Sequence, residues 1–109
     1  MLELLQERDT TRRDEDEALR LRVREDLRRH LSALLPGTIV IVFGSLSRSQ
    51  AFHSRSDIDL ALECEPERIT RYGLTSELME RLGRPADVIL LSESRLADKI
   101  RREGETWIV

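Results

Sequence analysis

The sequence predicts a single small domain of the α/β (α+β) class, in which helices flank a small mixed β-sheet. Short runs of β-branched and apolar residues indicate strands, and longer stretches with apolar residues at helical spacing indicate helices. The chain has 109 residues, which suffices for one hydrophobic core, and a second independent core is not expected. Residues 1–109 are therefore predicted to form one domain, with a leading helix over about 11–35 and a core over about 38–109.

The leading helix is predicted from its cap, its charges and its apolar stripe. Thr10 or Thr11 is expected to cap it, and the acidic residues 14–17 of its first turn suit the positive end of the helix dipole. Pro36 and Gly37 end it. Apolar residues recur at helical spacing and predict its buried side: Leu19, Val23, Leu27, Leu31, Leu34 and Leu35.

Four segments have the composition of strands. Residues 38–43 are apolar on both faces, which is typical of an interior strand. Residues 57–63 alternate between two faces, and 86–91 form a third apolar run. Residues 106–109 are expected to add an edge strand, which would fold the apolar tail from Trp107 onto the core.

Two further helices are expected between and after these strands. Pro66 opens the first of them, and the second spans 92–103 and stops at Gly104. Leu96 and Ile100 mark the inner side of the second helix. The inner side of the first is predicted to carry Ile69, Tyr72, Leu78, Met79 and Leu82.

Composition excludes several classes of protein. The 18 basic and 21 acidic residues leave a net charge of -3, whereas a non-specific nucleic-acid binder usually has a basic excess that neutralises phosphates. No window approaches the ~20 apolar residues of a membrane span, and the N-terminus lacks the order of a secretory signal, so a cytoplasmic protein is expected. Cys64 is the only cysteine, which excludes an internal disulfide and a cysteine metal cluster.

Two aspartates one residue apart carry the strongest chemical signal. Alternation puts Asp57 and Asp59 on one face of a strand, with their Cβ atoms about 7 Å apart. Two half-buried carboxylates repel unless a cation lies between them, and such hard oxygen ligands suit Mg²⁺. Asp87, at the start of the next apolar run, can join them if its strand is a neighbour. Alone, Asp-x-Asp could be a turn, a calcium loop or a solvent-facing pair.

A candidate phosphate-binding loop follows the first strand. Gly44 and Ser45 permit close backbone approach and offer N–H and hydroxyl groups to a phosphate, especially if a short helix starts there. Arg48 could grip phosphate or simply be solvated, and the former is favoured. Ser56 is expected to orient the carboxylate strand through turn hydrogen bonds, with direct nucleotide contact as the alternative. Together with the carboxylates, this loop predicts nucleotidyl transfer.

The motifs FGSLSRSQ…SDIDLAL and ADVILL resemble those of the minimal nucleotidyltransferases (MNT) of the DNA polymerase β superfamily. The resemblance implies a polymerase β-like fold, Gly44 and Ser45 holding the triphosphate of ATP, and Asp57, Asp59 and Asp87 as catalytic metal ligands of two Mg²⁺ ions. Bare single domains of this kind are commonly antitoxins of HEPN–MNT toxin–antitoxin systems. Such an antitoxin is thought to transfer AMP from ATP onto a tyrosine of the HEPN ribonuclease, which blocks the toxin.

The chain departs from the family pattern in the phosphate loop. Ser47, Arg48 and Ser49 stand where Ala-Arg-Gly is usual, and the spacer before Asp57 is about one residue longer. Either Ser49 must adopt the positive φ that glycine permits, or the longer spacer has moved the turn.

Two other functions stay open. One is a free-standing nucleotidyltransferase acting on a small hydroxyl compound, although that activity usually needs a further helical domain or a dimer. The other is a catalytically silent antitoxin that acts by occlusion, which the three intact carboxylates disfavour. Leu2, Leu4 and Leu5 lie outside the regular helical stripe and either fold back onto the core or contact a partner.

Overall fold

A computed structural model describes the backbone of residues 2–109 and the side chains from residue 10 onward. The sheet is mixed and four-stranded, in the order β3-β2-β1-β4, with β1 antiparallel to β2 and β4 and with β2 parallel to β3. The mixed sheet flanked by helices is the predicted fold class. The elements are α1 (Leu2–Leu34), β1 (Ile39–Phe43), the 3₁₀ helix η1 (Gly44–Ser47), β2 (Ile58–Leu62), α2 (Arg71–Leu82), β3 (Ala86–Leu90), the 3₁₀ helix η2 (Leu91–Glu93), α3 (Ala97–Glu103) and β4 (Glu105–Ile108).

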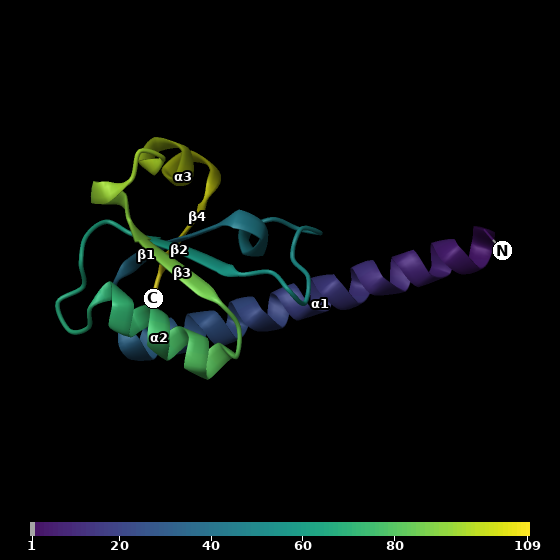
Figure 1. The fold of residues 1–109 in the computed structure, drawn as a ribbon, viewed down its shortest axis with the longest axis horizontal. Helices are drawn as coiled ribbons and strands as arrows, with labels where there is room; N and C mark the ends of the chain where they lie inside the picture. Colours follow the sequence, from purple (N-terminus) through teal and green to yellow (C-terminus); the bar gives the residue numbers. More distant parts are fainter. Residues whose placement is uncertain (1) are drawn as a thin grey trace.

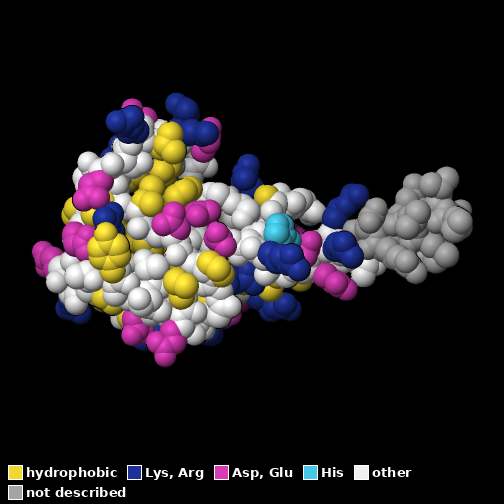
Figure 2. Space-filling model, in the orientation of Figure 1, with side chains coloured by type: hydrophobic (Ala, Val, Ile, Leu, Met, Phe, Trp, Pro, Cys, Tyr) yellow, Lys and Arg dark blue, Asp and Glu magenta, His cyan; other side chains and the backbone are white. Residues whose placement is uncertain are grey.

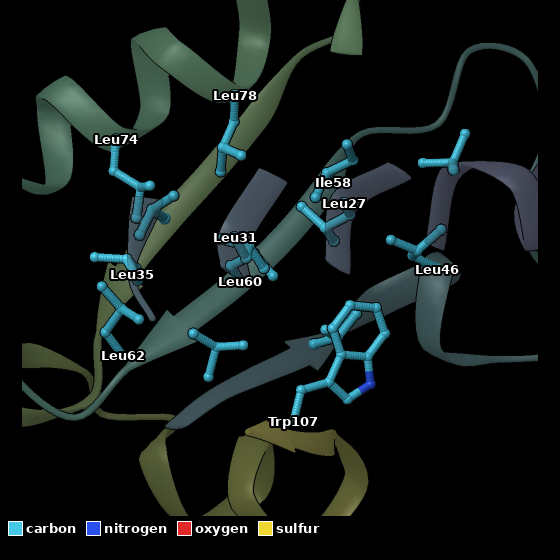
Figure 3. Packing of buried hydrophobic residues seen from close by; sticks show 14 of the residues in the cluster. Leu27, Leu31, Leu35, Leu46, Ile58, Leu60, Leu62, Leu74, Leu78 and Trp107 are labelled. Carbon is cyan, nitrogen blue, oxygen red and sulfur yellow. The ribbon is translucent and has the colours of Figure 1, made fainter. Parts of the chain in front are cut away.

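The main core lies between one face of the sheet and the pair of helices α1 and α2 (Figures 1 and 3). Leu27 and Leu31 of α1 are fully buried against this face, as are Leu74 and Leu78 of α2. The predicted stripe of α1 is confirmed, because Val23 and Leu35 are also buried and the flanking Leu19 and Leu34 pack against the same cluster.

The opposite face of the sheet is covered less completely. Among the described residues, those of the short helices α3 and η2 pack there, with Ile100 and Leu91 against Ile41 and Ala61. Ile89, level with Ala61 on the neighbouring strand, and Phe43, at the end of β1, pack against this cluster but remain partly exposed. This leaves an open stretch of sheet beside the C-terminal end of β1.

The leading helix begins earlier than predicted. α1 starts at Leu2, so Thr10 and Thr11 lie inside it and do not cap it. The segment 2–9 contains neither proline nor glycine and is rich in good helix formers, so the helix continues through the acidic stretch. The N-terminal half of α1 extends away from the body (Figure 1), in a molecule that measures 56 × 28 × 20 Å. The side chains of Leu2, Leu4 and Leu5 lie outside the described residues.

The predicted start and inner side of the second helix are also partly wrong. Thr70, not Pro66, provides the N-cap of α2, since its side chain accepts a hydrogen bond from the Gly73 N–H. Tyr72 and Met79 are exposed instead of buried, because the buried side of α2 is centred on Leu74 and Leu78, with Ile69 and Leu82 packed against the same cluster as predicted. The last predicted helix is divided into η2 and α3, and Leu96 between them is 59% exposed.

The C-terminal edge strand is confirmed. β4 pairs with β1 alone, and Trp107 is buried on the α1 side of the sheet. The guanidinium groups of Arg24 and Arg28 of α1 lie 5.2 and 4.2 Å from the centre of its ring. No helix in the described part of the chain has an apolar stretch long enough to cross a lipid bilayer.

Candidate functional site

The predicted carboxylates lie where β2 and β3 begin, beside the end of β1. Asp57 directly precedes β2, and Asp59 lies on β2 opposite Phe43, the last residue of β1. Asp87 lies beside Asp59 on β3, in register across the parallel pair. The expectation that the strand of Asp87 neighbours the aspartate strand is therefore confirmed, and the structure brings the three residues to the same end of these two strands.

Asp59 is the carboxylate most enclosed by this arrangement. It is half-buried, whereas Asp57 and Asp87 are exposed. Its pKa is raised above the ordinary value, first by burial and then by the negative charges of Asp87 and Asp57. Without a cation, the ionised form of Asp59 is thus disfavoured by the two carboxylates that the fold places beside it.

Gly44 fits against Asp59 in a way that no other residue could. Its φ is +71°, a conformation that side-chain-bearing residues rarely adopt. A Cβ atom at this position would collide with Oδ2 of Asp59. Glycine therefore both permits the turn out of β1 and lets the backbone of the candidate phosphate loop approach the carboxylate closely.

The donor set at this end of β2 and β3 suits a hard divalent cation. In the described part of the chain, no set of three His, Cys, Asp or Glu side chains is drawn together closely enough to hold a metal ion as it stands. Carboxylates without a cation repel one another, and the pKa of Asp59 is raised first by burial and then by that repulsion. The oxygen chemistry of the three aspartates fits Mg²⁺, and small rotations of exposed side chains would have to accompany binding.

A pocket of about 520 Å³, a volume within the range of small-molecule sites, opens beside Asp87, whereas Asp57 and Asp59 are not among the residues that line it. Figure 2 shows acidic side chains gathered over the middle of the sheet, with apolar side chains on either side of them. The pocket combines polar groups near the strand ends with an apolar wall from the uncovered sheet face and α3. Its lining residues are Phe43, Gly44, Ser47, Arg48, Asp87, Ile89, Ser94, Leu96, Lys99, Ile100 and Glu103.

A second depression, of about 530 Å³, lies at the opposite end of the sheet. It is lined by the turn after α1 and by residues 62–68, and none of the predicted site residues lines it. We assign the site to the first pocket because Gly44 and Asp87 line that pocket.

The candidate phosphate loop starts with a short 3₁₀ helix, which is the condition under which Gly44 and Ser45 were expected to suit a phosphate best. In η1 the hydroxyl of Ser47 donates to the Gly44 carbonyl over 2.8 Å. Phe52, farther along, is 2% exposed and anchors the loop in the main core. Among the described residues other than glycine, Gln50 alone has a positive φ, of 66°. The turn has therefore moved from position 49 to position 50, which is the alternative that the longer spacer predicted.

Glycine at position 50 is expected to stabilise the protein, whereas glycine at position 49 is not. Gln50→Gly removes the cost of a left-handed backbone at a residue with a side chain, so the free energy of unfolding should rise by about 0.5–1 kcal/mol. Ser49→Gly adds only freedom to the unfolded chain and should lower that free energy by a similar amount. Thermal melts of both variants and the wild type measure the difference. A gain in stability with Ser49→Gly but not with Gln50→Gly would contradict the displaced turn.

The remaining predicted residues differ in how they face the pocket. Arg48 is exposed and lines it, whereas Ser45 lies half-buried in η1 outside the lining. Ser56 is 8% exposed in the turn before β2. Its Oγ accepts from the His53 N–H and its carbonyl accepts from Arg84, both over 3.0 Å. These bonds are what a residue that orients the carboxylate strand would make, and nucleotide contact by Ser56 stays a prediction.

This geometry has a counterpart in a known family. Residues 25–108 match the sequence profile of the polymerase beta nucleotidyltransferase family. The chain belongs to this family. Its mixed sheet with flanking helices is consistent with the polymerase beta-like nucleotidyltransferase fold, so the fold implied by the resemblance is confirmed.

A solved structure supports the same fold. The chain is similar to one in the crystal structure of a toxin–antitoxin with AMP-PNP, at 24% sequence identity and a TM-score of 0.60. The similarity covers 78% of this chain and 73% of that one. No curated protein matches the chain.

Lys99 and Phe52 belong to the surroundings of the site but were not predicted from the sequence. Lys99 reaches the pocket because α3 crosses the uncovered face of the sheet, a placement that its own neighbours in the sequence do not signal. Phe52 is an isolated apolar residue in a polar loop. That isolation was the one available signal that the loop is pinned to the core.

Proposed function

We propose that this family member is the antitoxin of a toxin–antitoxin pair and that it transfers AMP from ATP onto a tyrosine hydroxyl of a cognate HEPN ribonuclease in the cytoplasm. The observation that carries the proposal is the juxtaposition of Asp59 and Asp87 with the Gly44 turn. The family supports nucleotidyl transfer, and the likeness to a toxin–antitoxin structure with AMP-PNP supports a nucleotide and a toxin as ligands.

The proposal assigns a role to each side of the pocket. The backbone at Gly44 and Ser45 holds the triphosphate, and Arg48 adds a positive charge. Asp57, Asp59 and Asp87 would hold two Mg²⁺ ions, which would neutralise charge on the triphosphate and make the acceptor hydroxyl more acidic. The apolar wall formed by Ile89 and its neighbours is the available surface for the adenine ring.

The reaction requires a new bond from the tyrosine oxygen to the α-phosphorus of ATP. That oxygen attacks as the bond between the α-phosphorus and the oxygen bridging to the β-phosphorus breaks, and pyrophosphate leaves. The hydroxyl proton passes to the carboxylate of Asp87, which is exposed at the pocket and free of the enclosure that holds Asp59. The domain thus contributes mainly positioning and charge, which is what phosphoryl transfer chiefly needs.

The open sheet face explains why the acceptor is expected to come from a partner protein. α3 packs over Ile41 and Ala61 and leaves Phe43 and Ile89, which line the pocket, partly exposed. A small acceptor would need a closed site to be held in line, whereas a tyrosine presented by a docked protein is positioned by that protein.

The test is transfer of labelled AMP from ATP to a HEPN-type helical protein encoded beside this chain. When the co-purified complex is incubated with α-labelled ATP and Mg²⁺, the partner is expected to become labelled. When Mg²⁺ is chelated before ATP is added, the partner is expected to stay unlabelled. Label that moves only to added small hydroxyl compounds would favour the free-standing enzyme. Complete absence of transfer would overturn the enzymatic proposal.

A further inference from the structure

Arg20 is the one buried charged residue among the described side chains, at 8% exposure. Its Nε donates to the Leu46 carbonyl over 2.9 Å, a contact that spans 26 positions in the sequence. Leu46 is itself fully buried and lies in η1, between Ser45 and Ser47. Burying a charge costs free energy unless the charge is paired and hydrogen-bonded, and the bond to Leu46 offsets part of that cost while it joins α1 to the loop.

Glu17 extends the contact to the far end of the same loop. Its Oε1 accepts from Arg20 over 2.7 Å, and its Oε2 accepts from the backbone N–H of Gln50 over 3.3 Å. Gln50 is the residue with the positive φ. One turn of α1 therefore contacts both the 3₁₀ helix and the displaced turn of the candidate phosphate loop.

Arg24 fixes this part of α1 to the rest of the sheet. It donates to the same Leu46 carbonyl over 3.2 Å and to the Glu105 carboxylate of β4 over 2.7 Å. The hydrogen bond from Arg24 is the largest cause that holds the pKa of Glu105 below its usual value. Glu105 also accepts from the indole N–H of Trp107, so these contacts continue into the core. We call the contacts of Glu17, Arg20 and Arg24 with the loop and with β4 the brace.

From these contacts we infer that Arg20 and Glu17 are positioning residues, which hold the 44–50 loop in the conformation that binds the triphosphate. Both precede residues 25–108, the part of the chain that matches the family, so the brace is supplied by the N-terminal extension of α1. The inference rests on the proposed nucleotide-binding role of the loop.

The brace suits a loop that departs from the usual family pattern. Ser49 stands where glycine is usual, and the left-handed turn lies at Gln50, which is not glycine. A conformation of this kind persists only where its surroundings over-determine it, and Glu17 provides a fixed acceptor for the Gln50 N–H. Small displacements of a phosphate loop reduce binding strongly, because its backbone N–H groups must all point at one ligand.

The test measures AMP-PNP affinity by calorimetry in Mg²⁺ buffer for the full chain and its variants. Arg20→Met keeps the length of the side chain and removes its hydrogen bonds, and it should weaken AMP-PNP binding about tenfold. Arg20→Lys should restore part of that loss. Arg28→Met is the matched control, because Arg28 lies on the same helix and stacks on Trp107. Its affinity for AMP-PNP should stay that of the wild type.

Transfer kinetics separate positioning from a general loss of stability. In Arg20→Met the KM for ATP should rise about tenfold while kcat changes much less, since the loop binds the triphosphate and does not carry the base. Glu17→Ala, with a side chain 20% exposed, is the milder variant to use if Arg20→Met folds poorly. The double variant should bind AMP-PNP no more weakly than Arg20→Met, because the two side chains act as one unit.

The outcomes distinguish this inference from the proposed function. Wild-type protein that binds no AMP-PNP would overturn both. If the wild type binds AMP-PNP and both Arg20→Met and Glu17→Ala keep its affinity and KM, the positioning role of Arg20 and Glu17 would be overturned and the proposed function would stand. An equal loss of affinity in Arg28→Met would also overturn the positioning role, since that result would reflect stability and not the loop.

Discussion

Asp59→Asn is expected to abolish AMP transfer and to leave the fold intact. Asp59 is the proposed metal ligand that approaches the Gly44 turn most closely, and its pKa is raised by burial and by the charges of Asp87 and Asp57. An asparagine preserves the shape of the side chain and removes the charge that would hold Mg²⁺. Transfer of labelled AMP should fall below detection in this variant, and in Asp57→Asn as well.

The stability of Asp59→Asn is expected to equal or exceed that of the wild type at neutral pH. The pKa of Asp59 is raised in the folded state by burial and by its acidic neighbours, so its ionised form disfavours the fold. This group contributes its full stability only below its unfolded pKa and loses that contribution as the pH rises through its folded pKa. Asparagine does not titrate, so any gain in melting temperature, at most about 5 °C, should shrink as the pH is lowered.

Asp98→Asn provides the matched control for both measurements. Asp98 is a carboxylate on α3 with 98% of its side chain exposed, and it is not among the residues that line the pocket. The Asp98→Asn variant should retain AMP transfer, and its melting temperature relative to the wild type should show no comparable change with pH. Transfer retained by Asp57→Asn and Asp59→Asn alike would show that the assigned carboxylates do not bind the catalytic metal.

The sheet could be predicted from the sequence because each of its strands has a strong local pattern. Ile39–Phe43 is apolar on both faces, and Ile58–Leu62 alternates, so the buried sides of both follow from the period of two. The ends of the helices were harder to predict from the sequence. Thr10 has the chemistry of a cap but lies within an uninterrupted helical segment, and Thr70 caps α2 although Pro66 was the stronger signal.

The carboxylates of the site could be predicted because their spacing follows from the strands that carry them. The brace could not, because the contact of Arg20 with Leu46 joins residues 26 positions apart and has no local pattern. Lys99 enters the pocket only through the path of α3 over the sheet. The position of the left-handed turn needed the loop geometry, since Ser49 and Gln50 are equally plausible from composition.

Neutralisation of the toxin offers the largest effect that the proposal predicts. Co-expression of the wild-type chain with the HEPN-type protein should raise the intact mass of that protein by whole adenylate units and suppress its ribonuclease activity. Asp87→Ala should prevent the mass increase, because Asp87 lies in register with Asp59 and is the exposed carboxylate proposed to take the tyrosine proton. Loss of a general base alone slows transfer by about 100-fold or more.

The Asp87→Ala complex separates chemistry from occlusion. If modification is what silences the toxin, the variant should still co-purify with it, since Asp87 is a single exposed residue, and the toxin in that complex should remain an active ribonuclease once released. Asp98→Ala should modify the toxin as the wild type does. A toxin that is fully neutralised by Asp87→Ala with no gain in mass would mean that docking over the open sheet face is sufficient and that transfer is not required.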